Sequence, residues 1–198
     1  MEALNRSLFL WLNAGDHPPQ LLIDLATFVA QWLVGGLGVL LLALWLWGGR
    51  TSRAAVLVAV QTVALGMACN LVIGQFFMHP RPFMIPLGHT YLAHAPETSF
   101  PSDHAVVFFA VGLGLCLYRR ALAAVVMALG VAVGTARVYL GVHFPFDIVG
   151  SLLVAIASYW VVAALMYPAA FQAQLLTGLE VVYRRLFEPA IKRGWVQA

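Results

Sequence analysis

Histidine, arginine and carboxylate side chains recur at short spacings in the second half of an otherwise apolar sequence. Arg137 is followed six residues later by His143, and Asp147 comes four residues after that histidine. Two shorter segments, Arg81-Pro82 and Pro101-Ser-Asp-His104, precede this string. An ionisable side chain beside lipid costs several kcal/mol unless it faces a cavity or a partner, so such a set indicates a functional site. The chemistry that these side chains suggest together is phosphoryl transfer.

Two arginines and one expected helix start are the candidate phosphate ligands. A phosphoryl transition state carries negative charge on its equatorial oxygens, and the planar guanidinium with its paired N–H donors matches their geometry. We therefore expect Arg81 and Arg137 to bind the phosphate. Ser102 and Asp103 stand where a helix should begin, and the free backbone N–H groups of its first turn can hold another phosphate oxygen.

His143 is the candidate nucleophile. A neutral imidazole can attack phosphorus, and a carboxylate on its other ring nitrogen fixes the tautomer and stabilises the charge that forms. Asp147 is close enough along the chain to do this. His104, which arrives from another helix, would protonate the departing oxygen and then activate water. The scheme predicts a phosphohistidine, and because the arginines supply the positive charge it needs neither a metal ion nor a cofactor.

The composition predicts an integral membrane protein. Of the 198 residues, 62% are hydrophobic and only 10% are charged, against about a quarter charged in soluble proteins. The basic residues are scattered in pairs and form no stripe with interleaved aromatics, so nucleic acid is not an expected partner. We expect one domain, residues 1–198, whose partners are membrane lipids and whose oligomeric state the sequence leaves open.

The elements that must position the site are membrane helices. Crossing roughly 30 Å of hydrocarbon takes about 20 apolar residues, and five stretches come close to that length. The predicted fold class is all-α, a polytopic membrane helical bundle with about five transmembrane helices. We place them near residues 20–47, 54–78, 104–118, 121–140 and 148–167.

Basic residues in the short connections predict the orientation. The positive-inside rule assigns Arg- and Lys-rich connections to the cytoplasm. Eight of the eleven basic residues then face it, namely Arg50, Arg53, Arg119, Arg120, Arg184, Arg185, Lys192 and Arg193. All six histidines, together with Arg81 and Arg137, fall on the opposite side. A site built from them would open away from the cytoplasm.

Both ends of the chain are expected to form helices in the membrane interface. Near the N-terminus apolar residues recur at helical spacing, at Leu4, Leu8, Trp11 and Leu12. The tail from 171 to 195 has a similar stripe, formed by Leu175, Leu179, Val182 and Leu186. Basic residues surround this second stripe, so we expect the tail helix to lie on a membrane surface that contains anionic lipid.

In their order and on one face, the three motifs resemble those of the type 2 phosphatidic acid phosphatase superfamily. The resemblance covers about residues 74–150 and rests on Arg81-Pro82, on Pro101 to His104 and on Arg137 to Asp147. It implies a membrane phosphatase and the same roles for His143, His104 and Asp147 as the residues themselves suggest.

The superfamily's first motif usually begins with a lysine seven residues before the arginine. Here that position is Gly74, and the only lysine, Lys192, is expected on the far side. The missing phosphate contact must come from another group or be absent. Gln75, His79 and the other loop histidines are the candidates.

Two further positions carry unusual residues. The glycine usual in the second motif is Asp103, and the serine usual before the third motif's arginine is Ala136, with Thr135 adjacent. A carboxylate close to an anionic substrate needs a donor or a cation beside it. Glu97, in the long polar loop between His79 and Asp103, either lines the pocket or is solvated.

Longer segments narrow the resemblance. Residues 74–83, 99–104 and 136–147 are similar to the bacitracin-resistance type of undecaprenyl pyrophosphate phosphatase, and the tail 191–195 is similar to its enterobacterial members. This subfamily implies a multi-pass protein of the bacterial cytoplasmic (inner) membrane whose site faces the periplasm or the cell exterior. It would convert undecaprenyl pyrophosphate, an isoprenyl pyrophosphate lipid, to undecaprenyl phosphate, and so support recycling of the cell wall lipid carrier and bacitracin resistance.

Other functions stay open at this point. A lipid phosphotransferase, or a phosphatase of phosphatidic acid or phosphatidylglycerol phosphate, would use the same chemistry. A transporter or scaffold for anionic lipid would use the charged face without catalysis.

Overall fold

The computed structural model describes residues 1–166 and 169–198, and within them it contains helices and no strands. The elements are α1 (Glu2–Leu12), α2 (Gln20–Trp47), α3 (Arg50–Phe76), a single 3-10 turn (Pro82–Met84), α4 (Asp103–Cys116), α5 (Arg120–Tyr139), α6 (Pro145–Met166), α7 (Ala169–Leu186) and α8 (Glu188–Lys192). The predicted all-α fold is confirmed.

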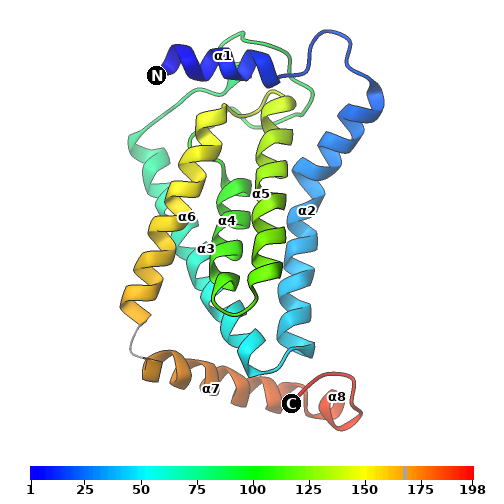
Figure 1. Ribbon diagram of the computed structural model, residues 1–198, viewed down its shortest axis with the longest axis vertical. Helices are drawn as coiled ribbons and strands as arrows, with labels where there is room; N and C mark the ends of the chain where they lie inside the picture. The colour runs from blue at the N-terminus through cyan, green and yellow to red at the C-terminus, as the bar shows by residue number, and fades with distance from the viewer. Residues whose placement is uncertain (167–168) are drawn as a thin grey trace.

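Helix α4 is the centre of the bundle, and α2, α3, α5 and α6 surround it (Figure 1). Apolar residues cover α4 on all sides, and a helix that is hydrophobic all round is buried. The main core lies where α4 meets α2, α3 and α5, around Leu37, Ala55, Phe108 and Val126. Gly114 allows close contact with α3, because a Cβ at this position would lie 2.4 Å from the Cα of Ala59.

Four helices are long and apolar enough to cross a membrane, namely α2, α3, α5 and α6. They correspond to four of the five predicted spans. The third, α4, has 14 residues, which at about 1.5 Å per residue is shorter than a hydrocarbon layer of roughly 30 Å. Its polar first turn begins inside the ring of longer helices. Residue 167, the expected end of the fifth span, lies outside the described residues.

Helix α3 begins four residues before the predicted span, because two arginines of the expected connection lie in its first turns. Arg53 is buried there. Its guanidinium lies 3.6 Å from Glu180 of α7 and donates to the backbone carbonyls of Gln197 and Trp45. A buried charge that is paired and hydrogen-bonded is compatible with a helix interior.

The two predicted flanking helices are present, and they lie across opposite ends of the bundle (Figure 1). In α1, Asn5 and Phe9 are buried, whereas Leu4 and Trp11 of the predicted apolar stripe are exposed. The same holds for α7, where Leu179, Val182 and Leu186 are exposed and a different face packs on the bundle. Most of each predicted stripe therefore faces away from the protein core, although Leu12 packs against the buried cluster of Phe9, Val138 and Phe144.

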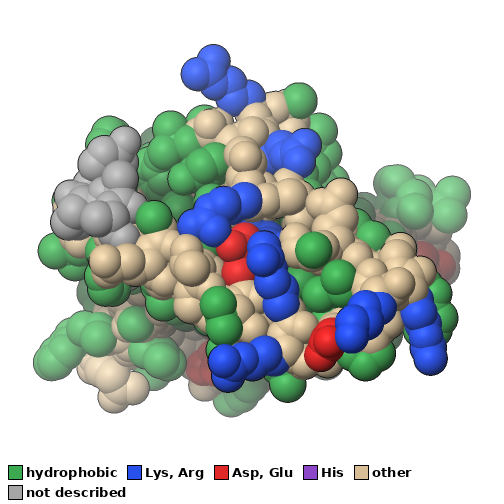
Figure 2. Space-filling view, turned by 90° about the horizontal axis from the view of Figure 1, so that it is seen from below, with side chains coloured by type: hydrophobic (Ala, Val, Ile, Leu, Met, Phe, Trp, Pro, Cys, Tyr) green, Lys and Arg blue, Asp and Glu red, His purple; other side chains and the backbone are tan. Residues whose placement is uncertain are grey.

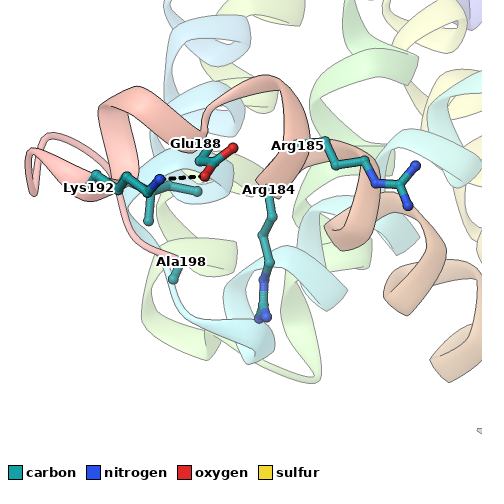
Figure 3. Close-up of a pocket in the computed structure, with 6 residues that line it drawn as sticks. Arg184, Arg185, Glu188, Lys192 and Ala198 are labelled. Carbon is teal, nitrogen blue, oxygen red and sulfur yellow. Dashed lines mark ion pairs between the residues drawn. The ribbon is translucent and has the colours of Figure 1, made fainter.

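Basic side chains gather at the end that carries α7 (Figure 2). A pocket of about 350 Å³ opens there, lined by Arg184, Arg185, Glu188, Ile191, Lys192 and Ala198 (Figure 3). Its carboxylate is paired, since Lys192 Nζ lies 2.6 Å from Glu188 Oε1. None of the predicted site residues lines this pocket. The candidate site lies at the other end of the bundle.

Candidate active site

The three motifs meet at the end of the bundle that α1 covers. Arg81 directly precedes the 3-10 turn after α3, and Arg137 lies in the last turn of α5. His104 lies in the first turn of α4, and Asp147 in the first turn of α6. His143 lies in the turn that joins α5 to α6. The expected convergence of these segments is therefore seen in the fold.

The turn around His143 follows from its sequence. Gly141 has a φ of +83°, a conformation that ends helices and favours glycine, and a Cβ there would lie 2.1 Å from the carbonyl oxygen of His89. The N–H of Val142 then donates to the carbonyl of Arg137 over 3.1 Å. Pro145 starts α6, where its fixed φ suits the first helical position. His143 is thus held between two helix ends.

His143 and Asp147 form a buried pair, each about 1% exposed. His143 Nδ1 lies 3.3 Å from Asp147 Oδ2. The same carboxylate oxygen accepts hydrogen bonds from the backbone N–H of Phe144, over 2.7 Å, and from the Ser99 hydroxyl. Donors at a helix start favour a charged carboxylate. Asp147 is therefore fixed as an acceptor for a proton on Nδ1.

Arg81 lies at the other nitrogen of the imidazole. Its NH1 is 3.1 Å from His143 Nε2 and donates to the carbonyl of Val142 over 2.9 Å. With Nδ1 directed to Asp147, Nε2 is the nitrogen that carries a lone pair, and it faces the guanidinium. A phosphate held by Arg81 would lie against Nε2 of His143.

Burial keeps the His143 imidazole neutral. Removal from solvent lowers the pKa of His143 to about 3, and the positive charge of Arg137 acts in the same direction, although Asp147 opposes both. A histidine is nucleophilic only in its neutral form. At neutral pH His143 is therefore in the form that nucleophilic attack requires, without a separate base.

Several buried polar atoms of the site make no hydrogen bond within the described residues. They include Nε of Arg81, Nε of Arg137 and Oγ of Ser102. Arg137 NH1 donates weakly, over 3.4 Å, to the carbonyl of Ala30 in α2. Buried polar groups are normally satisfied, and free donors in a buried site suit an anion. The two predicted arginines therefore have donor capacity left for phosphate oxygens.

The start of α4 differs from its expected form. The backbone N–H of Ser102 donates to Ser151 Oγ of α6 over 2.9 Å, so it is not free for phosphate. The N–H groups of Asp103 and His104 have no acceptor within the helix, since they belong to its first turn. The Asp103 carboxylate accepts from Asn70 Nδ2 over 2.7 Å. Asn70 of α3 is the donor that this unusual carboxylate requires.

The outer loop contributes two acid–base groups beside Arg81. Glu97 Oε1 lies 3.3 Å from Arg81 NH2 and 3.7 Å from His94 Nδ1. Burial lowers the pKa of His94, and the Arg81 charge lowers it further. Glu97 remains 59% exposed, so it lies at the rim of the site.

The residues expected to replace the phosphate contact of the missing lysine lie in different places. Gln75 is exposed in the last turn of α3 and, within the described part of the chain, makes no hydrogen bond to the site. His79 lies on the Asp147 side of His143, with its Nδ1 3.8 Å from Asp147 Oδ1. A Cβ at Gly74 would lie 3.1 Å from Thr98 Cγ2. The outer loop thus packs against the position where a lysine side chain would begin.

Among the described residues, no group of three or more His, Cys, Asp or Glu side chains is placed to hold a metal ion. The cationic atom beside His143 Nε2 is NH1 of Arg81, 3.1 Å away.

Over residues 55–170, more than half of the chain, the sequence matches the PAP2 superfamily. The chain belongs to the PAP2 superfamily. All three motifs lie within the matched region, and the predicted resemblance is confirmed.

Individual relatives within the PAP2 superfamily cover most of the chain. Escherichia coli (strain K12) YbjG, whose name carries a provisional assignment as an undecaprenyl-diphosphatase, is 36% identical over 198 residues, 100% of this chain and 99% of the relative. Bacillus subtilis (strain 168) undecaprenyl-diphosphatase BcrC is 32% identical over 153 residues, 77% of this chain and 79% of the relative. The crystal structure of Aquifex aeolicus LpxE aligns with a TM-score of 0.66 at 25% identity, covering 81% of this chain and 95% of that one.

Three contacts in this PAP2 site were not predicted. Ser99 donates to Asp147, Ser151 binds both backbone polar groups of Ser102, and Asn70 binds Asp103. Serine and asparagine on an apolar helix are usually interhelical hydrogen bonders, and that is what Ser151 and Asn70 are. Ser99 lies inside a quoted motif segment, but nothing in its spacing indicates that it reaches Asp147.

Proposed function

We propose that this chain hydrolyses undecaprenyl pyrophosphate to undecaprenyl phosphate and inorganic phosphate through a phosphohistidine at His143. The observation that carries the proposal is the placement of the buried imidazole, with Asp147 at Nδ1 and Arg81 at Nε2. The relatives named undecaprenyl-diphosphatase support this substrate.

In the first step the lone pair of His143 Nε2 forms a bond to the terminal phosphorus. The bond from this phosphorus to the bridging oxygen breaks, and undecaprenyl phosphate leaves. Arg81 and Arg137 bind the equatorial oxygens, where negative charge is greatest. Asp147 stabilises the proton that stays on Nδ1 while the ring becomes positively charged.

His104 is assigned to the leaving group and then to water. It protonates the departing oxygen, and in the second step it removes a proton from the attacking water. The bond between Nε2 and phosphorus then breaks, which releases inorganic phosphate and restores neutral His143. The proton that His104 gives up in the first step is regained from water in the second, so the proton count of the site is unchanged over one turnover.

The isoprenyl chain is proposed to leave the site between α2 and α3. In-line displacement places the leaving group opposite the nucleophile, which is the side of its proton donor, His104. Val107 and Val111 share a face of α4 with His104, three and seven residues on. Both valines line an apolar groove of about 160 Å³ together with Val34, Leu37, Gly38, Leu41, Val60 and Val63.

The site is proposed to face the periplasm or the cell exterior in the bacterial cytoplasmic membrane. Support comes from the eight basic residues of the connections and tail, which the positive-inside rule assigns to the cytoplasm. An outward site would receive the pyrophosphate form of the carrier released by wall polymer synthesis, and its hydrolysis would support carrier recycling and bacitracin resistance.

Phosphate release by the purified protein in detergent tests the proposal. We expect turnover of undecaprenyl pyrophosphate, loss of turnover in His143→Ala, and unchanged turnover in chelator. Faster phosphate release from phosphatidic acid or phosphatidylglycerol phosphate would assign that lipid as the substrate in place of undecaprenyl pyrophosphate. Full activity of His143→Ala would overturn the mechanism.

A further inference from the structure

The two oxygens of the Asp147 carboxylate have different surroundings. Oδ2 accepts from the Phe144 N–H and the Ser99 hydroxyl and lies beside His143 Nδ1. Oδ1 is buried and has no hydrogen-bond partner among the described residues. The side-chain atom that faces it is Nδ1 of His79, 3.8 Å away. This nitrogen is likewise buried and unpaired within the described residues.

His79 is held in place from several sides. Its ring stacks on Phe77, with centroids 6.2 Å apart and planes 3° from parallel, and its edge contacts Phe144 at 5.3 Å. Its carbonyl accepts from the backbone N–H of Ser99 over 2.7 Å. Ser99, which binds Oδ2 of Asp147, and His79, which faces Oδ1, therefore belong to two segments of the same outer loop that a backbone hydrogen bond joins.

We propose that His79 is a positioning residue for the catalytic pair. Its Nδ1–H closes onto Asp147 Oδ1 and holds the carboxylate in the plane that Nδ1 of His143 requires. This inference rests on the proposed function, since it matters only if His143 is the nucleophile. His79 transfers no proton and touches no phosphate; it acts through Asp147. Two anchored oxygens prevent rotation of the carboxylate when His143 becomes positively charged.

The other nitrogen of the same ring offers a different role. His79 Nε2 lies 3.6 Å from Glu2 Oε2 at the start of α1, so the ring could instead anchor this helix. The two roles use different nitrogens. The amide nitrogen of asparagine occupies the place of histidine Nδ1, whereas that of glutamine occupies the place of Nε2, so these two substitutions separate the roles.

The test measures kcat and KM of the full-length protein with undecaprenyl pyrophosphate in detergent. We expect His79→Ala to lower kcat by about 10- to 100-fold, as loss of a supporting partner does at other sites, with KM changed less than about threefold. His79→Asn keeps most of kcat, and His79→Gln resembles His79→Ala. The matched controls, Glu2→Ala and His89→Ala, keep full activity, because His89 is a loop histidine that pairs with Asp16.

Activity retained in His79→Gln but lost in His79→Asn would overturn the inference in favour of an α1 anchor. Equal activity of all three variants would also overturn it. If His79→Ala fails to fold, the comparison of His79→Asn with His79→Gln decides. Where His79→Ala folds, it should cost nothing further in an Asp147→Ala background, and an additive loss contradicts the inference. Active His143→Ala would refute the proposed mechanism itself, whereas inactive His143→Ala with an unaffected His79 series would refute only the role of His79.

Discussion

Filling the groove between α2 and α3 should slow the enzyme on long-chain substrate only. Gly38 lines this groove, and a Cβ added to it would meet no atom within 4 Å. Gly38→Leu therefore places a side chain in the groove at a position where its Cβ meets no protein atom. The proposed path of the isoprenyl chain crosses this space on its way from His104 to the lipid.

The size of the effect follows from the apolar contact that is lost. A leucine side chain would remove the room for about two methylene-sized groups of the lipid, each worth about 0.8 kcal/mol when buried. The resulting loss of about 1.6 kcal/mol corresponds to roughly a 15-fold decrease in kcat/KM. A one-unit isoprenyl pyrophosphate ends before the groove, so its kcat/KM should stay within about twofold of wild type.

Phosphate release from undecaprenyl pyrophosphate and from isopentenyl pyrophosphate, measured on the same preparation, gives the ratio of the two kcat/KM values. Gly36→Leu is the matched control, because it also has no atom within 4 Å of an added Cβ and lies on the opposite face of α2. Equal losses for both substrates in Gly38→Leu would refute the proposed path. So would the same loss in Gly36→Leu.

Three further outcomes follow from the site. Burial holds the pKa of His143 near 3, so the unfolded chain binds a proton below about pH 6.5 that the folded protein does not bind, and the protein loses stability as the pH falls. Thermal unfolding should show that His143→Asn loses about 2 kcal/mol less stability than wild type between pH 8 and about 5. Ser99→Ala should lower kcat roughly tenfold without raising KM, since a hydrogen bond to a charged group is worth about 1.5–3 kcal/mol; unchanged kcat would contradict the contact with Asp147. Asp103→Asn keeps an acceptor for Asn70 but removes a negative charge beside the anionic substrate. KM at low salt should therefore fall about fivefold, which corresponds to a free energy on the order of 1 kcal/mol. A higher KM would refute that electrostatic account.

Hydropathy and motif spacing were sufficient to predict the helices and the histidine–carboxylate pair. Long apolar runs leave few alternatives to membrane helices, and Asp147 lies one helical turn from His143. The predicted helix bounds were wrong where tertiary contacts determine where a helix begins. Arg53 lies within α3 because Glu180, far away in sequence, pairs with it.

The contacts of the loop could not be predicted for the same reason. Ser99 and His79 reach Asp147 only because the outer loop folds back over α6, and no local pattern encodes that path. Spacing alone made His79 a phosphate candidate, whereas the fold places it behind the nucleophile. Helix-start reasoning assigned a free N–H to Ser102, but Ser151 of another helix accepts it.

The central claim is that phosphate passes through His143, and trapping the intermediate tests it most directly. Purified protein is mixed with undecaprenyl pyrophosphate labelled in the terminal phosphate and quenched in alkali before the first turnover is complete. We predict an acid-labile, alkali-stable label on the peptide that contains His143, and none in the His143→Ala protein. Turnover with no labelled protein, or a label on any other residue, would contradict the account.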